Sequence, residues 1–459
     1  MSQQREVLTS SKILEILQED GGRVHFIGVG GVSMCSLFCL SRYFGILCSG
    51  SDRAESEITE ALSSAGEDIF VGEREALPTD TRLVVYSHAI DSENRELRLA
   101  DKQGIPAVTR AEYLGALMSC YEWRVGVSGS HGKSTVTAMI GKIFFDAGLS
   151  PTVLSGARLY RSKLPFSIGA LDYLVYEACE YKDSFLSFSP TVALFLNMEL
   201  DHTDYFRDEN ALASSFLKAM ARAETVIVNR DDSALYSLAQ RSGKRVISYG
   251  ASYGCDYRYE TISAEAGNIR FRVFEAEREL GEVCLSLLGE FNVSNATAAI
   301  AAAREVSVEF SAVAKSLSEF CTVERRLERI GNYKGRALYY DYAHHPTEIK
   351  ASISAVRRAL GGKVTVIFRP HTYSRTAGLW EGFKEALSSA DFVILLDIDA
   401  VREREIAGVS SERLAGEIGA RLLCDEVDID NLLSKTEGSI ILMGAADLSG
   451  VKKRLTNEK

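Results

Sequence analysis

The stretch Arg124-Val-Gly-Val-Ser-Gly-Ser-His-Gly-Lys-Ser-Thr-Val-Thr-Ala138 decides how this chain folds. Its apolar start predicts a short strand, its glycines predict a turn, and its proline-free continuation predicts a helix that begins near Ser134. Backbone N–H groups of such a turn point inward, and the helix N-terminus adds partial positive charge, so together they predict a phosphate-binding site. We expect Lys133 to reach the outer phosphates and the Ser134 hydroxyl to bind Mg²⁺.

The motif departs from the strict phosphate-loop pattern at one position. Val127 stands where that pattern has its first glycine, which leaves the shorter Gly129-x-x-Gly132-Lys133-Ser134. An ordinary glycine-rich turn between a strand and a helix is the alternative interpretation, and the rest of the chain has to decide between the two.

The composition describes a globular protein that is not built to bind nucleic acid. A length of 459 residues predicts two to four domains, and 46% hydrophobic with 25% charged residues is typical of chains with full cores. The net charge of −11 argues against nonspecific nucleic-acid binding, which needs basic surface. An anionic substrate must then be held locally, by glycine loops and single Arg or Lys residues.

Cysteine use and apolar runs indicate a cytoplasmic location and no insertion into a membrane. The nine cysteines include no Cys-x-x-Cys pair, so neither a disulfide nor a cysteine metal site is expected. Residues 1–20 are polar and lack the apolar core of a signal peptide. No apolar run approaches about 18 residues, the length that a membrane span needs.

A second glycine turn lies near the start, in His25-Phe-Ile-Gly-Val-Gly-Gly-Val32. We expect a strand over 24–27, a turn and then a helix. The pattern resembles the dinucleotide-binding fingerprint, although Ser33 stands at the third glycine position. A nucleotide-like group is therefore predicted here, and the alternative is a βαβ unit whose glycines serve packing alone. The glycines of this turn are Gly28, Gly30 and Gly31.

Polar residues follow the next two predicted strands. Residues 46–49 predict a strand that leads into Gly50-Ser51-Asp52, and an acidic residue at that place commonly meets a ribose hydroxyl. Residues 83–90 predict another, which ends in polar residues that include Ser87 and His88. Ligands of open α/β sheets bind beyond the carboxyl ends of strands, so these side chains are candidates for one cleft.

Two later strands end in groups that suit a metal ion. Tyr173-Leu-Val-Tyr-Glu177 ends in a carboxylate, and residues 191–197 lead into Glu199-Leu-Asp-His-Thr-Asp204. Phosphoryl transfer needs acidic or imidazole ligands for Mg²⁺, and Glu177 and His202 suit that task. We expect the two strands to be neighbours whose ends meet beside the phosphate turn. The alternatives are a solvated or capping Glu177 and a His202 that only caps the following helix.

The rest of the central region predicts further α/β structure. Strands are expected over 225–229 and 245–249, and short antiparallel strands over 255–288, before an alanine-rich helix. Asn292 and Asn295 at the head of that helix can present amides to a base or a phosphate, although as plain caps they need no function.

A third α/β region begins near Arg325. Strand–turn–helix units are predicted at 337–348 and 362–376, and two more buried strands at 391–396 and 439–443. Since strands alternate with helices, a parallel sheet wrapped by helices is expected. The chain is predicted to be α/β, with a Rossmann-like domain, a central phosphate-loop ATPase domain and a second Rossmann-like domain. Their expected bounds are 1–120, 121–324 and 325–459.

Histidines gather at predicted strand ends. Of the seven histidines, only His25 falls inside a predicted strand. Turns beyond strand ends are where α/β enzymes hold their chemistry, so this placement favours a catalytic cleft. The six that follow strand ends are His88, His131, His202, His344, His345 and His371.

Six motifs in this order resemble those of the Mur ligase family, and the resemblance covers nearly the whole chain. They are His25-Phe-Ile-Gly-Val-Gly-Gly-Val32, Ser49-Gly-Ser-Asp52, Gly129-Ser-His-Gly-Lys-Ser-Thr135, Glu199-Leu-Asp-His-Thr-Asp204, Asp341-Tyr-Ala-His-His-Pro-Thr-Glu348 and Pro370-His-Thr-Tyr-Ser-Arg-Thr376. The family has an N-terminal domain for a UDP-sugar, a central ATPase domain and a C-terminal domain for the incoming amino acid. Such enzymes use ATP with Mg²⁺, or Mn²⁺ in its place, to make an acyl phosphate that an amine then attacks.

The motifs look most like those of the members that join L-alanine to UDP-N-acetylmuramate in peptidoglycan precursor synthesis. By position, the resemblance implies that Lys133 stabilises the transferring phosphoryl group, while His344 and Arg375 place the amino acid. It implies metal ligation by Ser134, Glu177 and His202. It implies ATP contacts from Gly129, Ser130, His131, Gly132, Lys133, Ser134, Thr135, Asn292, Asn295, Arg326 and Asp341. It implies that the UDP-sugar is bordered by Gly28, Gly30, Gly31, Ser51, Asp52, Ser87, His88 and Arg110.

The chain also departs from the family pattern. The usual Glu-Ala-Asp-Glu-Ser-Asp is here Glu177-Ala-Cys-Glu-Tyr-Lys182, with Cys179 in place of an acid. Thr372 replaces an arginine and Ala446 a glycine, while residues 324–328 look more like the relatives that recycle murein peptides. Such a recycling ligase and a nucleotide or UDP-sugar sensor without catalysis are the alternatives, and L-alanine, glycine and L-serine remain open as the amino acid.

Overall fold

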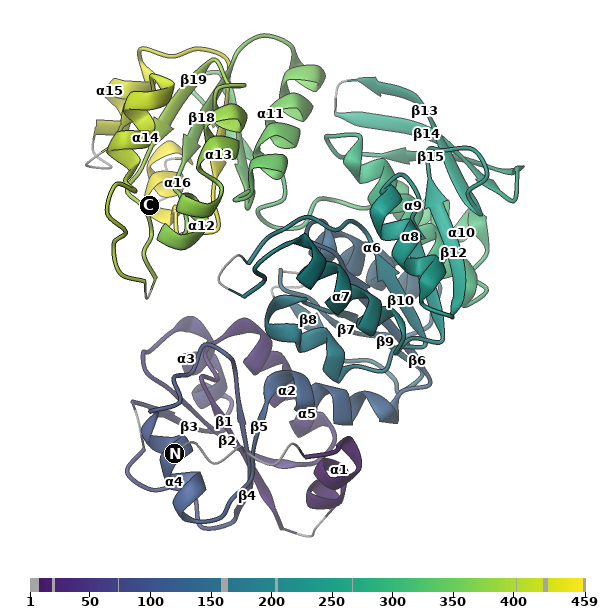
Figure 1. Cartoon of the computed structure of the whole chain (residues 1–459), viewed down its shortest axis with the longest axis vertical. Helices are drawn as coiled ribbons and strands as arrows, with labels where there is room; N and C mark the ends of the chain where they lie inside the picture. The colour runs from purple at the N-terminus through teal and green to yellow at the C-terminus, as the bar shows by residue number, and fades with distance from the viewer. Residues whose placement is uncertain are drawn as a thin grey trace.

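The computed structural model describes residues 8–18, 21–72, 74–157, 164–202, 205–265, 267–401, 403–423 and 428–456. Three α/β units, each built on its own sheet, follow one another along the chain (Figure 1). The first unit lies at the bottom of that view, the central unit at the right and the C-terminal unit at the upper left. The α/β class and the three-unit architecture expected from the sequence are confirmed.

The first sheet has five parallel strands in the order β3-β2-β1-β4-β5. Its strands are β1 (Arg23–Ile27), β2 (Leu47–Asp52), β3 (Asp68–Val71), β4 (Thr81–Tyr86) and β5 (Ala107–Thr109). Its helices are α1 (Ser10–Gln18), α2 (Val32–Tyr43), α3 (Glu57–Ser64), α4 (Arg95–Lys102), α5 (Arg110–Leu117) and the 3₁₀ turn η1 (Met118–Cys120). The strand order reverses direction at β1, so the turn after β1 lies at a switch point, where ligands of such sheets bind.

The central sheet has ten strands in the order β15-β14-β13-β12-β11-β10-β6-β9-β7-β8. Its strands are β6 (Trp123–Ser128), β7 (Thr152–Leu154), β8 (Phe166–Ser167), β9 (Tyr173–Glu177), β10 (Val192–Phe195), β11 (Thr225–Asn229), β12 (Arg245–Gly250), β13 (Tyr257–Glu265), β14 (Asn268–Glu275) and β15 (Arg278–Leu285). Its helices are α6 (Lys133–Asp146), η2 (Tyr181–Ser187), α7 (Glu209–Met220), α8 (Ser233–Arg241), α9 (Phe291–Glu305) and α10 (Phe310–Ser318). The antiparallel strands expected over 255–288 are present as β13, β14 and β15.

The expectation that β9 and β10 are neighbours is wrong. β6 lies between them and pairs in parallel with both. Hydrophobic pattern shows that these segments are strands but carries no information on their order, which explains the error. The carboxyl ends of β9 and β10 therefore flank the phosphate loop from its two sides.

The C-terminal sheet has six strands in the order β16-β17-β21-β18-β19-β20, and only the β16–β17 pair is antiparallel. Its strands are β16 (Glu328–Tyr333), β17 (Arg336–Asp341), β18 (Val364–Phe368), β19 (Phe392–Leu395), β20 (Arg421–Leu422) and β21 (Ser439–Met443). Its helices are α11 (Pro346–Leu360), α12 (Tyr373–Gly378), α13 (Trp380–Leu387), α14 (Ser411–Ile418), α15 (Ile429–Leu433) and α16 (Ser449–Thr456).

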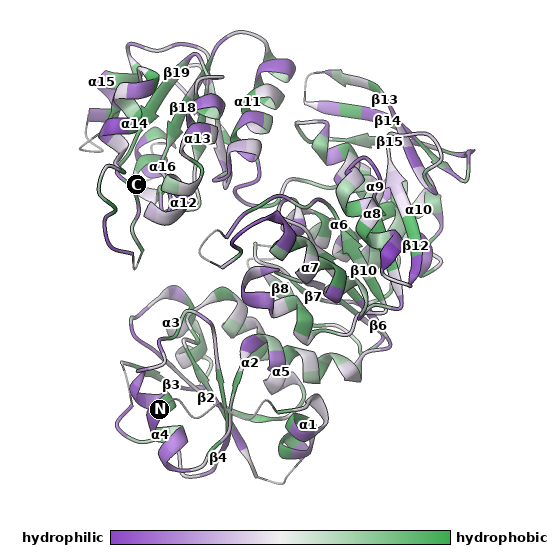
Figure 2. Cartoon of the chain, in the orientation of Figure 1, coloured by the Kyte–Doolittle hydropathy of each residue, from purple (hydrophilic) through white to green (hydrophobic). Residues whose placement is uncertain are grey.

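Hydrophobic residues run along the strands of each sheet (Figure 2), and buried hydrophobic residues of the strands and helices form the cores. Every residue of β18 and of β21 is buried, because helices cover both faces of a parallel sheet. α9 is rich in alanine, and its small side chains let it pack closely against α6 at the phosphate loop. No helix in the described part of the chain combines the length and the apolar character that crossing a bilayer requires.

Candidate active site

The phosphate loop joins β6 to α6. Gly129 and Gly132 have φ values of 137° and 87°, which residues with side chains rarely adopt. A Cβ at Gly132 would lie only 2.8 Å from Oδ1 of Asn295, so this glycine also lets α9 approach the loop. The His131 N–H donates to Oδ1 of Asn197 at 2.8 Å, and the Asn197 amide donates back to the His131 carbonyl at 3.1 Å. These contacts fix the loop against the end of β10.

The Lys133 ammonium lies inside this loop. It donates to the carbonyls of Gly129 and Ser130, and it lies 3.1 Å from the carboxylate of Glu180, which is 2% exposed. Burial by itself lowers the pKa of Lys133, but the Glu180 carboxylate outweighs it and leaves that pKa raised. The lysine is therefore cationic at neutral pH and fixed at the loop.

Glu180, rather than the predicted Glu177, forms the ion pair with Lys133 and lies near the His202 ring. Glu177 ends β9 and accepts hydrogen bonds from the Gly156 N–H and, at 3.1 Å, from the Ser155 hydroxyl. Glu180 follows three residues later, where the chain has left the strand, and it is the N-cap residue of η2. Both carboxylates line the same cavity as Lys133 and His202, so metal binding by Glu177 stays a prediction and Glu180 is a second candidate.

His202 completes a small cluster with this acid. Its Nε2 lies 3.8 Å from Oε1 of Glu180, and its ring lies over Tyr181 with centroids 4.6 Å apart. One donor atom each of Cys179, Glu180 and His202 lies within 4.8 Å of the others. Burial lowers the pKa of His202, which favours the neutral imidazole that can bind a metal.

These residues fit a divalent cation. The Ser134 hydroxyl is 4% exposed and lies 3.4 Å from a guanidinium nitrogen of Arg326. A carboxylate and a hydroxyl supply the oxygen donors that Mg²⁺ prefers, and the imidazole of His202 is a donor that Mn²⁺ also accepts.

A cavity of about 200 Å³ lies beside the loop, where the central and C-terminal units meet. Leu287, Phe291 and Leu327 give it apolar walls of the kind that a purine ring needs. Seven of the residues predicted to contact ATP line it: His131, Gly132, Thr135, Asn292, Asn295, Arg326 and Asp341. Ser130, Lys133 and Ser134 line the larger neighbouring cavity instead, and Gly129 lines neither.

The polar groups of this cavity are held in position. The Asn292 amide donates to the Leu288 carbonyl at 2.7 Å and its oxygen accepts from Asn295 at 3.2 Å, so both asparagines are oriented. Burial raises the pKa of Asp341 to about 6, although the Ser352 hydroxyl that donates to it acts in the opposite direction.

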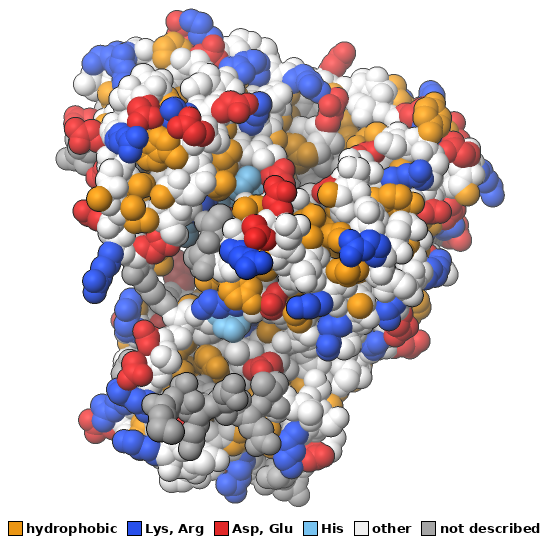
Figure 3. Space-filling model, in the orientation of Figure 1, with side chains coloured by type: hydrophobic (Ala, Val, Ile, Leu, Met, Phe, Trp, Pro, Cys, Tyr) orange, Lys and Arg blue, Asp and Glu red, His pale blue; other side chains and the backbone are white. Residues whose placement is uncertain are grey.

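A larger cavity of about 1050 Å³ opens where all three units meet. Val32 and Glu57 come from the first unit, Lys133 from the central unit, and His344 and Arg375 from the C-terminal unit. The space-filling view shows the surface hollowed between the first and C-terminal units (Figure 3). Residues far apart in the sequence thus share one cleft.

Asp201 joins the central unit to the C-terminal unit. Its two carboxylate oxygens accept hydrogen bonds from Nε and Nη2 of Arg375, at 3.0 and 3.3 Å. Burial raises the pKa of Asp201, but the Arg375 guanidinium prevails and holds that pKa well below its usual range. The Asp201 side chain is 7% exposed and the Arg375 side chain 13%, so this ion pair is shielded from water.

His344 lies against the same carboxylate. Its Nδ1 is 3.0 Å from the carbonyl oxygen of Tyr342, which can only accept, so Nδ1 carries the proton. Its Nε2 is then an unprotonated acceptor, 3.9 Å from Asp201. Burial lowers the pKa of His344 to about 4, so the ring is neutral at physiological pH.

The first unit holds the predicted glycine turn, and two residues predicted to contact a ligand there, Ser51 and Asp52, make hydrogen bonds within the protein instead. The N–H groups of Gly28 and Val29 donate to the Ser51 carbonyl, and the Gly30 N–H donates to Oδ2 of Asp52 at 2.8 Å. Ser51 is 1% exposed and its hydroxyl donates to Glu96, so its burial argues against a side-chain contact with the UDP-sugar, which stays a prediction. β2 extends to Asp52, beyond its predicted end, which turns Ser51 into the core.

The other predicted sugar-site residues lie between the first and central units. The Lys182 ammonium is 3.5 Å from the His88 carbonyl, and burial lowers the pKa of His88. Arg110 lines a small cavity together with Glu177 and Cys179. The Ser87 hydroxyl accepts from the Ala89 N–H at 3.3 Å. Whether these residues bind a ligand stays a prediction.

Sequence reasoning missed Glu180 and the partnership of Asp201 with Arg375. A signal for Glu180 was present, because it is the second acid of the motif 177–182. No local signal pairs Asp201 with Arg375, which are 174 residues apart.

Comparison with known proteins agrees with this architecture. Residues 23–122 match the description "Mur ligase family, catalytic domain", residues 127–303 "Mur ligase middle domain", and residues 325–442 "Mur ligase, glutamate ligase domain". The chain is 39% identical to the UDP-N-acetylmuramate–L-alanine ligase of Caldicellulosiruptor bescii, over 85% of this chain and 86% of that one.

Solved structures share the fold. The UDP-N-acetylmuramate–alanine ligase of Thermotoga maritima has a TM-score of 0.79 at 24% identity, over 95% of this chain and 98% of that one. A murein peptide ligase from Psychrobacter arcticus has a TM-score of 0.68 at 22% identity, with the same coverage. The three matched regions and the 39% identity over most of both chains show that this chain belongs to the Mur ligase family.

Proposed function

We propose that this protein joins L-alanine to the carboxylate of UDP-N-acetylmuramate while ATP becomes ADP and phosphate, a step of peptidoglycan precursor synthesis. The observation that carries the proposal is the single cleft lined by all three units, with Lys133 and Arg375 on its walls. The names of curated relatives that are 38–39% identical over most of the chain support the same reaction. In this proposal, residues 1–120 hold the UDP-sugar, 121–324 hold ATP and 325–459 hold the amino acid.

Mg²⁺, or Mn²⁺ in its place, is assigned to Ser134, Glu180 and His202. Bound there, the ion would neutralise phosphate charge and orient the transferred group. The neutral state of His202 and the burial of Glu180 suit this role.

In the first step, an oxygen of the substrate carboxylate attacks the γ-phosphorus of ATP, and the bond from that phosphorus to the β-bridging oxygen breaks. An acyl phosphate and ADP result. Lys133 provides fixed positive charge where the transferring group becomes more negative, and because it is already held in place it need not reorganise.

In the second step, the amine of L-alanine attacks the acyl carbon, and phosphate leaves to give the amide. The amine must lose a proton, and the neutral His344, which lines the cleft, has an unprotonated Nε2 that can accept it. Arg375, oriented by Asp201, supplies a guanidinium to the carboxylate of the amino acid.

A phosphate-release assay separates the candidate reactions. UDP-N-acetylmuramate with L-alanine is expected to support release, whereas a murein peptide in place of L-alanine is not. Phosphate release that requires the murein peptide in place of L-alanine, with UDP-N-acetylmuramate present, would favour the recycling ligase. ATP binding without phosphate release in any of the mixtures would favour a sensor. Glycine and L-serine in parallel assays measure the selectivity, which one methyl group limits to about 1–3 kcal/mol.

Replacing Arg375 by Ala is expected to lower kcat/KM for L-alanine by about 10²-fold, because it removes the guanidinium that would bind the carboxylate of the amino acid, and loss of one partner of a buried charge pair costs binding about 2–5 kcal/mol. KM for ATP should change little. Steady-state kinetics with each substrate varied provide the measurement. Arg369→Ala is the control, since that side chain bonds the carbonyls of Asp397 and Asp447 instead; equal losses in both variants would contradict the role of Arg375.

Replacing Gly30 by Ala is expected to raise KM for the UDP-sugar about tenfold, because a hydrogen bond to a charged group contributes about 1.5 kcal/mol. A Cβ there would lie 2.8 Å from Oδ2 of Asp52 and displace the carboxylate that caps the turn. Gly31→Ala is the comparison within the same turn, and a smaller rise is expected, since its Cβ would meet only the Gly28 carbonyl, at 3.4 Å. Equal rises in KM for ATP would argue against a sugar site in the first unit.

A further inference from the structure

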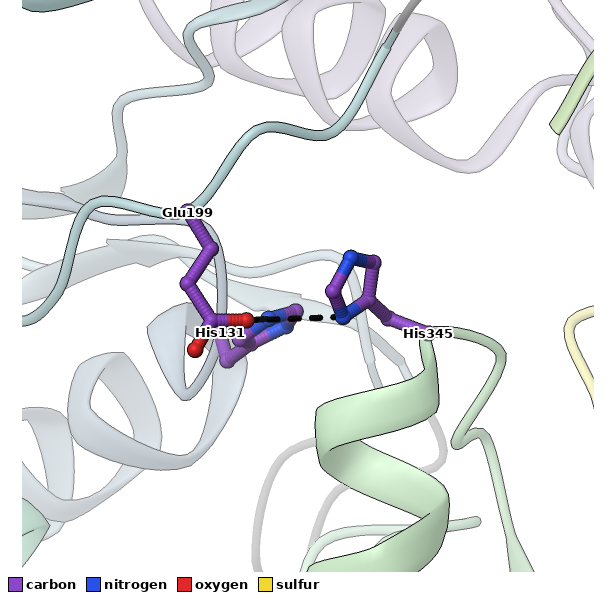
Figure 4. A group of neighbouring side chains, drawn as sticks. All are labelled: His131, Glu199 and His345. Atoms are coloured by element: carbon purple, nitrogen blue, oxygen red, sulfur yellow. Dashed lines mark hydrogen bonds and ion pairs between the residues drawn. The ribbon is translucent and has the colours of Figure 1, made fainter. Parts of the chain in front are cut away.

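Three side chains from separate segments surround one point at the boundary between the central and C-terminal units. His131 belongs to the phosphate loop, Glu199 follows β10, and His345 is the N-cap residue of α11. Oε2 of Glu199 lies 3.1 Å from Nε2 of His131 and 3.4 Å from Nδ1 of His345. Figure 4 shows the carboxylate reaching toward His345 across the gap between the two units.

The spacing of these atoms matches a coordination shell. Zinc ligands at about 2.0–2.1 Å in a tetrahedron stand about 3.3–3.4 Å apart. The two carboxylate–imidazole separations lie close to that value, and one donor atom of each residue lies within 4.8 Å of the other two. The two rings are 4.9 Å apart between centroids and tilted by 43°, so they are not stacked face to face.

We propose that His131, Glu199 and His345 form a binding site for a transition-metal dication such as Zn²⁺, which links the phosphate loop to the C-terminal unit. Two imidazoles and one carboxylate are a donor set that suits Zn²⁺, Co²⁺ or Ni²⁺, whereas Mg²⁺ prefers an all-oxygen shell. The site is separate from the Ser134, Glu180 and His202 set that is assigned to Mg²⁺.

A further carboxylate, that of Glu348, contacts the ring nitrogen of His131 on the side away from Glu199. Oε1 of Glu348 lies 3.1 Å from Nδ1 of His131, the ring nitrogen that points away from Glu199, although the two atoms are not aligned as a hydrogen bond. Carboxylates on the outer nitrogen of a metal-binding histidine are common, because they orient the ring and make it a stronger donor. Glu348 therefore adds negative charge without occupying the coordination position.

Protonation of His131 competes with metal binding at this site. Burial lowers the pKa of His131, but Glu348 and Glu199 outweigh it and raise that pKa to about 9. An imidazolium between two carboxylates is thus the state without metal. The same negative surroundings attract a dication, which would displace the proton from Nε2.

The site also has room for a fourth ligand. His131, Glu199, Thr347 and Glu348 line the cavity of about 200 Å³ beside the phosphate loop. A water molecule or a phosphate oxygen in that cavity can complete a tetrahedral shell. A metal ion there would couple the position of the C-terminal unit to the nucleotide-binding loop.

Cobalt titration of the full chain tests the proposal, with Co²⁺ as the probe. The protein is first treated with a chelator and then titrated in saturating Mg²⁺, which fills sites of hard oxygen donors. We expect the visible d–d absorption of tetrahedral Co²⁺, saturating at one ion per chain, and its loss on addition of Zn²⁺. The readout is coordination rather than catalysis, so it does not depend on the proposed reaction.

Variants identify the ligands. His345→Asn removes the imidazole but keeps an oxygen that can cap α11. Nδ1 of His345 accepts from the Thr347 N–H at 3.4 Å, a long hydrogen bond that a metal ion on Nδ1 would replace. Glu199→Gln removes the charge at nearly constant volume. Both are expected to abolish the tetrahedral spectrum. Cys179→Ser is the matched control in the neighbouring cluster and is expected to keep it.

Three outcomes overturn the proposal. Wild-type protein without a tetrahedral cobalt spectrum has no such site. A spectrum that survives in both His345→Asn and Glu199→Gln belongs to other ligands. A spectrum with thiolate-to-cobalt charge transfer that is lost in Cys179→Ser places the ion in the cluster of Cys179, Glu180 and His202. Circular dichroism shows whether each variant is folded. If His345→Asn does not fold, the cobalt spectrum of Glu199→Gln tests the site.

Discussion

Replacing Lys133 by Ala is expected to lower the turnover of the ligase reaction by about 10²-fold or more, the usual effect of removing one preorganised donor to a developing charge. The ammonium is held by the Gly129 and Ser130 carbonyls and by Glu180, so it is already aimed at the phosphate position. Rates of ADP formation with saturating UDP-N-acetylmuramate, L-alanine and Mg²⁺ provide the measurement.

The same variant is also expected to be less stable. Loss of Lys133 leaves the buried Glu180 without its nearest cation, and an unpaired buried charge costs about 3–5 kcal/mol. Lys133→Arg, which keeps the charge but changes its geometry, separates the two effects, since it should restore much of the stability and little of the turnover. Lys218→Ala on the exposed side of α7 is the surface control. Near-normal turnover of folded Lys133→Ala would remove the phosphate loop from the mechanism.

Sequence patterns predicted the elements of this fold better than their arrangement. The predicted strands 173–177 and 225–229 coincide with β9 and β11, because buried parallel strands are continuous apolar runs between turns. The insertion of β6 between β9 and β10 was missed, since strand order depends on contacts between units of the chain rather than on local periodicity.

Candidate site residues were predictable where a motif fixes the backbone. The glycines of the phosphate loop have the positive φ values that their motif predicts, and seven predicted ATP contacts share one cavity. Ser51 shows where a motif is not enough, because β2 extends past its predicted end and the Ser51 hydroxyl donates to Glu96. The Asp201–Arg375 pair lay beyond sequence reasoning, since it exists only once two units dock.

The sequence predicts Glu177 as the acidic metal ligand, whereas the structure places Glu180 closest to the Lys133 ammonium. Both are acids of one short motif, and the first ends a strand, the usual place for a catalytic group. Beyond Glu177 the chain leaves the sheet, and Lys182 and Asp183 in η2 have positive φ. Glu180, between the strand and η2, meets the Lys133 ammonium, while Glu177 accepts hydrogen bonds from Ser155 and Gly156.

Glu180→Gln is therefore expected to lower turnover by about 10²-fold or more and to raise the Mg²⁺ concentration needed for half-maximal activity, because it removes a charged metal ligand and the partner of Lys133 together. Glu177→Gln, the matched variant three residues earlier, is expected to shift the Mg²⁺ requirement much less, since its carboxylate serves local hydrogen bonds. Mg²⁺ titrations of ADP formation in wild type and both variants compare the two carboxylates directly. A larger shift for Glu177→Gln than for Glu180→Gln would reverse the assignment and return the metal to the end of β9.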